Sequence, residues 1–587
     1  MPRPTRAMPD CTAMIVAPQP EAVEAGHAVL SAGGSAVDAV LACAFTQGVV
    51  DPMMCGIGGL GSMQVFDAAS GDHLILDGLS TCPAACTPTM WADVFERECA
   101  DGYGYVLTGS VNELGRAAVT TPGILRLFER AHARFGSLQW RDLLTPAIGF
   151  ATDGWMIRPH VASMFSLNEA AYGRQPYSAK LGLTPDGTAL YLRSDGTPKR
   201  IGDPVCNPDL AETLGTIARH GVEDFYTGSI AERIVADMRA HGGLLSAADL
   251  ADFRVRVHAP LEVTYRGRRV TLPPPPAGGI VVAEMLRILE RFDLQALGHN
   301  SVGYIQVVAE AMKIAGLDKE THIGDPDFVP PPLAMLLSDD YADACAARIR
   351  AGERTSLPRV GGDSKHTTTV SCVDARGMVV SLTHTLGVPS GVIPPGTGFM
   401  LNGAMNWYDP RPGRPGSIAP GKRRFSSMTP TLVFEDATPV MTLGAPGGAW
   451  IGVAVLQTLL NVLDWGMTMQ EAVSAPRFSA TTDVIDISNR IPRAVQREIE
   501  ALGYNVRRSP LSFPFAAPHG ITLWDGRLQG GADPQRDGYA AGVQAQAGLV
   551  ARNASDAASS GHVAGRQAGQ EPGCNRAHHN VCQELGN

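Results

Sequence analysis

A histidine followed by three threonines, His366 to Thr369, is the part of this sequence best suited to nucleophilic chemistry. A threonine hydroxyl is a weak nucleophile unless a base removes its proton. If the peptide bond before Thr367 is cut, the new α-amine, with an ordinary pKa of about 8, lies within reach of the hydroxyl of the same residue. The pattern has two interpretations: the threonines simply favour a strand, or the first of them begins a chain that carries nucleophile and base together.

The residues around the threonines include what such a nucleophile needs. A polar, glycine-containing loop, GGDSKH, precedes Thr367, and an apolar strand pattern follows it. Further along, the stretch LGAPGGAW contains Gly447 and Gly448. Their N–H groups can approach an oxyanion closely, because no Cβ hinders them. Each feature also occurs by chance, so spacing alone leaves both interpretations open.

Composition limits the classes of protein to consider. The chain has 587 residues, of which 44% are hydrophobic, so it can bury a large core within one layered body or more than one domain. Its net charge of −10, without a basic block, argues against a nucleic-acid partner. No stretch approaches the roughly 20 apolar residues of a membrane helix, and we recognise no signal peptide. With 11 cysteines, an odd number, we expect reduced thiols and a cytoplasmic protein that does not contact a membrane.

The pattern of elements predicts a layered α/β architecture. Residues 20–50 have helical periodicity that Gly33 and Gly34 interrupt, and residues 110–260 read mostly as amphipathic helices. From about 330 to 366 the sequence is polar and irregular. Strand pairs follow at 369–387 and 429–448, and then a buried helix at 453–466.

Two other motifs are weaker signals. The G-x-G-G-x-G at 56–61 precedes a strand, whereas a dinucleotide-binding loop follows one, so close backbone packing is the better interpretation. Beyond Gly542 the chain is rich in small and polar residues, which predicts a disordered tail. The tail contains Cys574, His578, His579 and Cys582, which are zinc-compatible types, but half a cluster in such a segment is weak evidence and we predict no metal site.

Nine stretches, in order along the chain, resemble the γ-glutamyltranspeptidase family of N-terminal-nucleophile hydrolases over roughly residues 14 to 540. They are AGGSAVDAVLA, DPMMCGIGG, VTTPGI, LPPPPAGGI, AEAMKIAGLDKETHIGDPDF, TTTVSCVDARGMVVSLTHTLG, GKRRFSSMTPTLVF, GAPGGAWI and GGADPQRDG. The resemblance implies an α/β fold, a four-layer αββα sandwich. It also implies a precursor that is cut into a large chain, 1–366, and a small catalytic chain, 367–542, with 543–587 as the tail.

The resemblance assigns the reactive residues. Thr367 matches the threonine that becomes the first residue of the small chain and accepts the acyl group, which makes His366–Thr367 the cleavage site. Thr385 matches the second threonine, which hydrogen-bonds the nucleophile. Gly447 and Gly448 match the oxyanion pair. The implied reaction is hydrolysis of a small-molecule amide, or transfer of its acyl group to an amine, without a metal or an organic cofactor.

Substrate recognition departs from the family pattern. Ser426 and Ser427 match the serine pair that contacts the α-carboxylate of the γ-glutamyl group. The other positions that grip its amino-acid head are replaced, by Leu79 where the family has arginine, and by Gly387, Ala404 and Trp407. Losing a bidentate arginine and an acid together weakens binding of that head by orders of magnitude unless other residues compensate.

Four nearby residues are candidates for that compensation. Asn406 and Asp409 are near enough in sequence to replace the ammonium contacts, and Arg423 or Arg424 is a less favoured candidate for the carboxylate. Three functions therefore stay open: hydrolysis of γ-glutamyl amides such as glutathione, hydrolysis of a non-glutamyl amide or acyl compound, and an inactive, unprocessed homologue with a binding role.

Overall fold

The computed structural model describes residues 11–358 and 366–544. Its larger sheet is antiparallel, with the strand order β20-β1-β11-β12-β2-β3-β8. The strands are β1 (Cys11–Ala17), β2 (Leu60–Asp67), β3 (Asp72–Gly78), β8 (Arg256–His258), β11 (Thr368–Val373), β12 (Val379–Thr385) and β20 (Tyr539–Gln544). The predicted strand pair after His366 is thus β11 and β12, at the middle of this sheet.

A second antiparallel sheet has the order β19-β18-β14-β13-β10-β9. Its strands are β9 (Leu261–Tyr265), β10 (Arg268–Leu272), β13 (Thr431–Glu435), β14 (Thr438–Gly444), β18 (His519–Trp524) and β19 (Arg527–Ala532). Three small sheets complete the described strands: β4 (Phe95–Glu98) with β5 (Tyr105–Leu107), β6 (Trp155–Met156) with β7 (Pro204–Val205), and β15 (Phe478–Ser479) with β16 (Val484–Ile487) and β17 (Asn505–Arg508).

The two large sheets face one another. Apolar residues from β1, β11 and β12 pack there against residues from β13, β18 and β19. Hydroxyls add hydrogen bonds between the sheets: Ser371 Oγ donates to the His519 carbonyl at 3.1 Å, and Ser381 Oγ donates to the Leu443 carbonyl at 3.1 Å. Strands covered on both faces read as nearly continuous apolar runs, which explains why all of β11 and β12 is buried.

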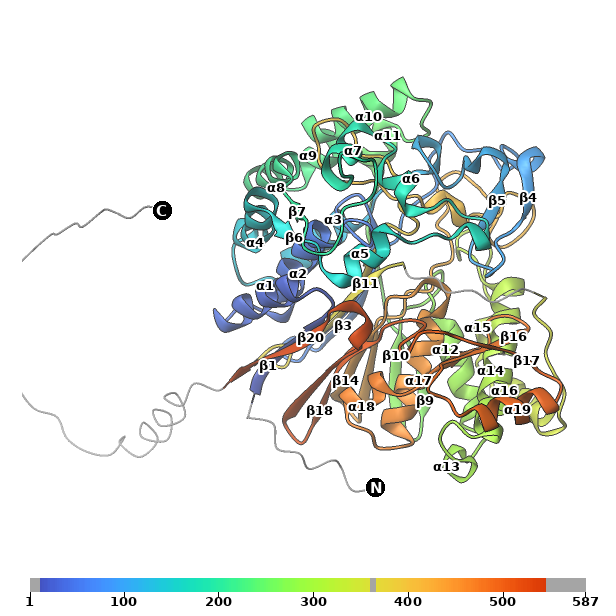
Figure 1. The fold of residues 1–587 in the computed structure, drawn as a ribbon. Helices are drawn as coiled ribbons and strands as arrows, with labels where there is room; N and C mark the ends of the chain where they lie inside the picture. Colours follow the sequence, from blue (N-terminus) through green and yellow to red (C-terminus); the bar gives the residue numbers. More distant parts are fainter. Residues whose placement is uncertain (1–10, 359–365, 545–587) are drawn as a thin grey trace, which may run out of the picture. The chain divides into compact units, whose positions relative to one another are not determined.

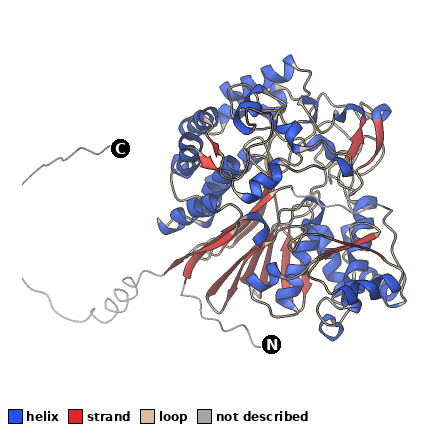
Figure 2. Ribbon diagram, viewed as in Figure 1, coloured by secondary structure: helices blue, strands red, loops and turns tan. Residues whose placement is uncertain are grey.

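Helices cover the outer face of each sheet (Figures 1 and 2). The first eleven share a core with the larger sheet. They are α1 (Pro20–Ser31), α2 (Ala36–Val50), α3 (Ile124–Phe135), α4 (Trp140–Asp153), α5 (Pro159–Phe165), α6 (Tyr177–Leu181), α7 (Pro185–Tyr191), α8 (Pro208–His220), α9 (Glu223–Thr227), α10 (Ser229–Ala240) and α11 (Ala247–Asp252). The interruption at Gly33 and Gly34 separates α1 from α2, as the sequence predicts, and Ser35 and Asp38 form a capping box at the start of α2.

The remaining helices lie on the side of the second sheet, and most of them share its core. They are α12 (Gly279–Leu289), α13 (Leu294–Leu297), α14 (Val302–His322), α15 (Leu333–Leu336), α16 (Asp339–Arg350), α17 (Ile451–Leu463), α18 (Met469–Ser474) and α19 (Arg493–Ala501). The layers run helices, sheet, sheet, helices, which confirms the predicted αββα sandwich. Within the described residues, no helix is both long enough and apolar enough to cross a membrane.

Two boundaries differ from the sequence-based expectation. Residues 339–350, predicted to be irregular, form helix α16, because Ser338 caps its first turn and buried apolar residues line one face of an otherwise polar helix. Strand β20 continues to Gln544, so Val543 pairs with Ala13 and the folded part extends two residues beyond the predicted boundary at 542. The tail residues Cys574, His578, His579 and Cys582 lie outside the described residues.

The glycine-dense turn before β2 supports the central strands by close packing, as predicted. A Cβ at Gly59 would collide with the carbonyl oxygen of Thr385, and one at Gly58 would lie 3.1 Å from the Cα of Leu401. The turn therefore presses directly on the end of β12, where Thr385 lies.

Candidate active site

Thr367 lies just before β11 in a strained backbone conformation. Its φ is +88° and the residue is only 2% exposed. A β-branched residue at positive φ is a true outlier and stores about 1–3 kcal/mol of strain. This torsion exists only while Thr367 is joined to the carbonyl carbon of His366. Cutting that peptide bond removes the strained torsion.

The Thr367 hydroxyl is held by Thr385, as the sequence comparison implies. Thr367 Oγ1 donates to Thr385 Oγ1 at 3.2 Å, and the Gly387 N–H donates to the same Thr385 oxygen at 2.8 Å. The pairing of β11 with β12 puts Thr368 opposite His384, which brings Thr367 next to Thr385. The Thr385 hydroxyl thus fixes the position of the Thr367 side chain.

The carbonyl of the bond before Thr367 already has a hydrogen-bond donor. The Gly447 N–H donates to the His366 carbonyl oxygen at 2.8 Å. Gly447 has a φ of +143°, and a Cβ there would collide with Ala516, so this approach requires glycine. Gly448 is engaged through its own carbonyl, which accepts the Ser427 hydroxyl at 2.6 Å. The Gly447 N–H and the Thr367 hydroxyl are therefore both at the His366–Thr367 peptide bond. Cleavage of that bond needs both, a donor for the oxyanion and a nucleophile.

His366 is fully buried between two tyrosine rings. The centroid of its ring lies 6.2 Å from that of Tyr103 and 5.9 Å from that of Tyr177. The Tyr177 hydroxyl lies 2.5 Å from His366 Nδ1, and burial raises the pKa of Tyr177, so this hydroxyl keeps its proton and donates it. Burial also lowers the pKa of His366, although Glu169 opposes the effect, so the imidazole is neutral.

A buried ionic cluster lies on the other side of His366. Glu169 Oε2 is 3.4 Å from His366 Nε2, and Arg174 binds both Glu169 and Asp101. Burial alone would raise the pKa of Glu169, but the Arg174 charge lowers it well below its ordinary value. Arg536 donates to the Thr367 carbonyl at 2.8 Å. Both residues at the predicted cleavage site are therefore fixed by contacts, His366 through its ring and Thr367 through its carbonyl.

Tyr177→Phe is expected to slow maturation of the precursor about fivefold, because one buried hydrogen bond to His366 is worth about 1 kcal/mol. The rate is read from the appearance of two bands on denaturing gels after synthesis in vitro. Tyr226→Phe is the matched control, because Tyr226 is buried and its hydroxyl donates to the Pro122 carbonyl at 3.1 Å instead. Equal rates for both variants would show that Tyr177 does not position the bond.

A model of the gamma-glutamyltranspeptidase family matches residues 22–543, most of the chain. The chain belongs to the gamma-glutamyltranspeptidase family. As a member, it is an enzyme of the hydrolase and acyltransferase type. The match covers the His366–Thr367 segment and the strands of both large sheets except β1 and the last residue of β20.

Similar members of the family differ in named activity. The chain is 38% identical over 505 residues to the acylase ACY 1 proenzyme of Pseudomonas sp. strain V22, over 85% of this chain and 88% of that protein. It is 36% identical over 486 residues to the glutathione hydrolase proenzyme of Pseudomonas sp. strain A14, over 79% and 81%. The solved structure of cephalosporin acylase from Bacillus halodurans aligns with a TM-score of 0.81 and 27% identity, over 93% of this chain and 99% of that one.

Three of the positions that depart from the family's glutamyl-binding pattern lie together in one apolar cluster. Leu79, Ala404 and Trp407 are buried there, with Tyr103 and Met428 among their neighbours. The side chains of Leu79, Ala404 and Trp407 offer neither a counter-charge nor a hydrogen-bond acceptor to an ammonium group, so its desolvation there is costly. Within the described residues, these three side chains therefore form a wall where the family pattern has charged and polar groups.

The fourth position, Gly387, is coupled to Trp407. A Cβ at Gly387 would lie 2.7 Å from Cη2 and Cζ3 of the Trp407 ring, and φ at Gly387 is +72°. The tryptophan thus occupies the space that a side chain at 387 would need. The departures from the family pattern at 387 and at 407 therefore depend on each other, because the Trp407 ring fits only when residue 387 has no side chain.

Gly387→Ala is expected to lower the free energy of unfolding by about 1–3 kcal/mol, through overpacking and the positive φ. Adding Trp407→Ala removes the collision, so the double variant should lose about 1 kcal/mol less than the sum of the single variants. Urea unfolding in a Thr367→Ala background measures this. Gly71→Ala is the control, because Gly71 has a φ of +75° with open space around it. Strictly additive losses would contradict the coupling.

A cavity of about 250 Å³ lies beside this wall and is lined by Tyr103, Trp407, Ser427 and Asp409 among others. Ser427 of the serine pair reaches the cavity, whereas Ser426 does not line it and contacts backbone through its N–H, which donates to the Pro276 carbonyl. Tyr103 contacts both the cavity and His366. The Tyr103 ring therefore lies between the cavity and His366, and neither His366 nor Thr367 lines the cavity itself.

The predicted substitutes for the ammonium contacts are not available. Asn406 is buried outside the cavity lining and donates to the Tyr105 carbonyl at 3.4 Å. Asp409 lines the cavity, but Arg411 binds both of its carboxylate oxygens at 2.8 Å. Arg423, a candidate for the carboxylate contact instead, is bound by Asp77 and Asp325. Asn406 thus lies away from the cavity, and the other two side chains are already bound to partners, so none is placed to bind the amino-acid head of a γ-glutamyl substrate.

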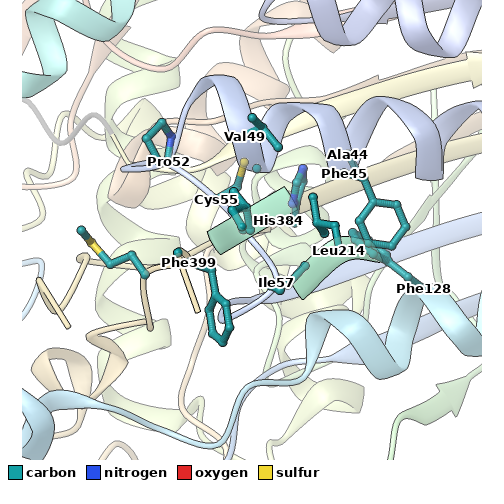
Figure 3. Close-up of a pocket in the computed structure, with 15 residues that line it drawn as sticks. Ala44, Phe45, Val49, Pro52, Cys55, Ile57, Phe128, Leu214, His384 and Phe399 are labelled. Atoms are coloured by element: carbon teal, nitrogen blue, oxygen red, sulfur yellow. The ribbon is translucent and has the colours of Figure 1, made fainter. Parts of the chain in front are cut away.

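A second pocket, shown in Figure 3, lies between the larger sheet and its helices and has a mostly apolar lining. Phe45, Phe128, Leu214 and Phe399 line it, and the ring of His384 faces it. His384 Nε2 hydrogen-bonds Gln47 Oε1 at 2.8 Å, and burial lowers the pKa of His384 to about 3. This pocket is small and apolar, and neither Thr367 nor Thr385 lines it.

Several residues that hold the site were not predicted from sequence. Tyr103, Glu169 and Tyr177 lie in the helix-rich first part of the chain without any motif of their own. Arg536 does lie in a family-like stretch, GGADPQRDG, which was the available signal for it. In the described part of the chain, no group of three or more His, Cys, Asp or Glu side chains is arranged to hold a metal.

Proposed function

We propose that this enzyme is a self-processing threonine amidohydrolase whose substrates are acyl amides without the free α-amino group of a glutamyl head. Its large chain would be residues 1–366, and its small chain would begin at Thr367. The proposal has two parts, the processing of the precursor and the choice of substrate, and different observations support them.

The strained φ torsion of Thr367 and the contacts of the peptide bond before it support self-processing. Thr367 Oγ1 attacks the His366 carbonyl carbon, and the Gly447 N–H stabilises the negative oxygen. The C–N bond breaks, the hydroxyl proton ends on the nitrogen, and His366 is left as an ester on Thr367. Water then hydrolyses the ester, which yields the His366 carboxylate and a free Thr367 α-amine. The names of the related proenzymes agree with such a step.

The mature enzyme would repeat the same chemistry on an external amide. The α-amine of Thr367 takes the proton from its own hydroxyl, and the hydroxyl attacks the substrate carbonyl. The Gly447 N–H, and that of Gly448 as the family pattern implies, would stabilise the oxyanion. The amine product leaves with the proton, and water or an acceptor amine then releases the acyl group from Thr367.

The observation that carries the choice of substrate is the Trp407 ring packed over Gly387, next to Thr385. With Asp409 bound by Arg411, the described residues offer no free carboxylate at the cavity wall to bind an ammonium group. The acylase names of a 38% identical relative and of the aligned structure agree with this choice.

Hydrolysis of γ-glutamyl amides such as glutathione is the second candidate. Ser427 of the retained serine pair lines the cavity, and a 36% identical relative is named a glutathione hydrolase. On that function, binding of the ammonium group would need a partner formed only after cleavage of the chain.

Two p-nitroanilides that differ only in the α-amino group separate the candidates. Glutaryl-p-nitroanilide is γ-glutamyl-p-nitroanilide without that group. For the fully cleaved enzyme we expect a kcat/KM for the glutaryl compound at least equal to that for the glutamyl compound, with or without glycylglycine as acceptor. A clear preference for the γ-glutamyl compound, about tenfold or more, would contradict the proposed substrate class and favour the second candidate.

A further inference from the structure

The backbone that carries the oxyanion donor rests on residues 515–517, which we call the backing segment. Gly447 lies directly against Ala516, since a Cβ on Gly447 would be only 2.4 Å from the Cβ of Ala516. The next residue, Ala517, donates its N–H to the Pro446 carbonyl at 3.0 Å. The direction of the Gly447 N–H therefore depends on the position of the backing segment.

The backing segment does not keep its shape by local preference. Phe515 has a φ of +75°, a strained conformation for an aromatic residue. Its ring packs edge-on against that of Trp450, with the centroids 4.7 Å apart, and Ala516 and Ala517 are fully buried. Contacts from outside the segment are therefore needed to hold it in place.

Two side chains hold the segment through one carbonyl. Arg477 Nη2 donates to the Ala516 carbonyl at 2.9 Å, and Gln535 Nε2 donates to the same oxygen at 3.2 Å. Arg477 is 2% exposed, and it also donates to the Val473 carbonyl and to Asp533. A guanidinium can bridge these three acceptors because its donors point in several fixed directions. The fully buried carboxylate of Asp533 balances its charge.

Asp533 also begins the turn that reaches the nucleophile. Its Oδ1 accepts the Gln535 N–H at 3.0 Å and caps the single 3₁₀ turn Pro534–Arg536. At the end of this turn, Arg536 donates to the Thr367 carbonyl at 2.8 Å. The Arg477–Asp533 ion pair is therefore connected to the oxyanion donor through the backing segment and to the nucleophile through this turn.

We propose that Arg477 and Asp533 are positioning residues for the reaction, and that their ion pair aligns the oxyanion donor with the nucleophile. They act through the backing segment and the turn, not on the substrate itself. The inference goes beyond the choice of substrate, because donor and nucleophile serve every acyl group, but its kinetic test rests on the proposed amidohydrolase function. A displacement of about 1 Å or less lowers the rate of the chemical step and leaves substrate binding almost unchanged.

Arg477→Lys tests the proposal, because it keeps a positive charge beside Asp533 but loses the fork that bridges separate acceptors. We expect kcat per cleaved chain to fall about 30-fold, with KM within about twofold of the wild-type value. The factor should be the same for every p-nitroanilide that the enzyme turns over, whatever its acyl group. Maturation should slow to a similar extent, because the same donor binds the His366 carbonyl.

Arg266→Lys is the matched control. Arg266 lies in the turn between β9 and β10, and it also bridges one carboxylate and two carbonyls, those of Asp464, Glu290 and Phe292. This variant should lower the free energy of unfolding without changing kcat or the maturation rate. Gln535→Met is a milder variant for the case in which Arg477→Lys does not fold. It removes one of the two donors to Ala516 and should lower kcat about threefold.

A purely structural role predicts that Arg477→Lys behaves as Arg266→Lys does, with kcat per cleaved chain unchanged. That result would overturn the proposal, as would a change in KM alone. If the wild type is not cut or turns over no anilide, the proposed function fails, and amide hydrogen exchange in the Thr367→Ala protein decides the positioning. Arg477→Lys should then speed exchange of the Gly447 and Ala517 N–H groups about tenfold, whereas Arg266→Lys should not. Equal exchange in the two variants would overturn the proposal.

Discussion

Thr367→Ala is expected to remain a single chain of 61.9 kDa with no detectable amidase activity. Alanine lacks the hydroxyl that attacks the His366 carbonyl, while the Gly447 N–H and the Tyr177 and Arg536 contacts stay in place. Without that attack the α-amine is never released, so both the nucleophile and its base are lost. Denaturing electrophoresis of purified protein, with an assay of glutaryl-p-nitroanilide hydrolysis, measures both effects.

Thr368→Ala is the matched control, because its hydroxyl lies one residue further and bonds the Gln47 side chain at 3.1 Å instead. We expect this variant to be cut and active. Cleavage of Thr367→Ala at the same bond would show that another group performs the processing. A wild-type protein that remains uncut would support the inactive homologue with a binding role and remove the enzymatic mechanism.

Thr385→Val is expected to slow both maturation and turnover about 100-fold. Valine keeps the shape of the side chain but removes the oxygen that accepts from Thr367 Oγ1 and from the Gly387 N–H. The Thr367 hydroxyl and the Gly387 N–H then lack an acceptor, and the Thr367 hydroxyl is free to turn away from the carbonyl carbon that it attacks. Moving a nucleophile by about 1 Å slows a reaction by a factor of about 100. The measurements are the rate of band conversion and the kcat of the protein that has matured.

Thr383→Val provides the comparison, since Thr383 is two residues earlier on β12 and its hydroxyl lies 3.4 Å from that of Thr369. It should change either rate by no more than a few-fold. If both variants behave alike, Thr385 acts only through strand packing, and the hydrogen bond to Thr367 has no part in the reaction.

Sequence patterns predicted the strands β11 to β14 because these have strong local signals, whereas the four-layer arrangement was implied by the family resemblance. β11 and β12 are β-branched, apolar runs joined by an Ala-Arg-Gly turn, and α1 and α2 are separated by two glycines. Helix α16 was missed because its exposed face is polar and its apolar face is narrow, so the composition resembles a loop. What fixes such a helix is packing against distant residues, which a local pattern does not contain.

The site was predictable only where its residues lie in recognisable stretches. Thr367, Thr385 and Gly447 meet as the resemblance implies, and Ser427 reaches the cavity. Asn406 was chosen for its closeness in sequence to Trp407, but the chain turns there and buries it away from the cavity. Closeness along the chain does not determine where a side chain points. Asn406 was therefore assigned to the site wrongly, although it is only one residue from Trp407.

Other expectations follow from residue pairs that only the fold reveals. The ion pairs of Arg423 and Asp409 involve partners elsewhere in the chain or on the cavity rim, so neither side chain is free to bind a ligand. The collision between a side chain at 387 and Trp407 explains two departures from the family pattern together. The cytoplasmic location and the chain boundaries at 366 and 367 stay predictions from the sequence.

The most direct test of the central claim is the intact mass of the purified wild-type protein, with N-terminal sequencing of the smaller chain. Self-processing by Thr367 predicts two chains in equal amounts, with the smaller one beginning Thr-Thr-Thr-Val-Ser and the larger one ending at His366. A single uncut mass, or a smaller chain that begins at any residue other than Thr367, would contradict the account.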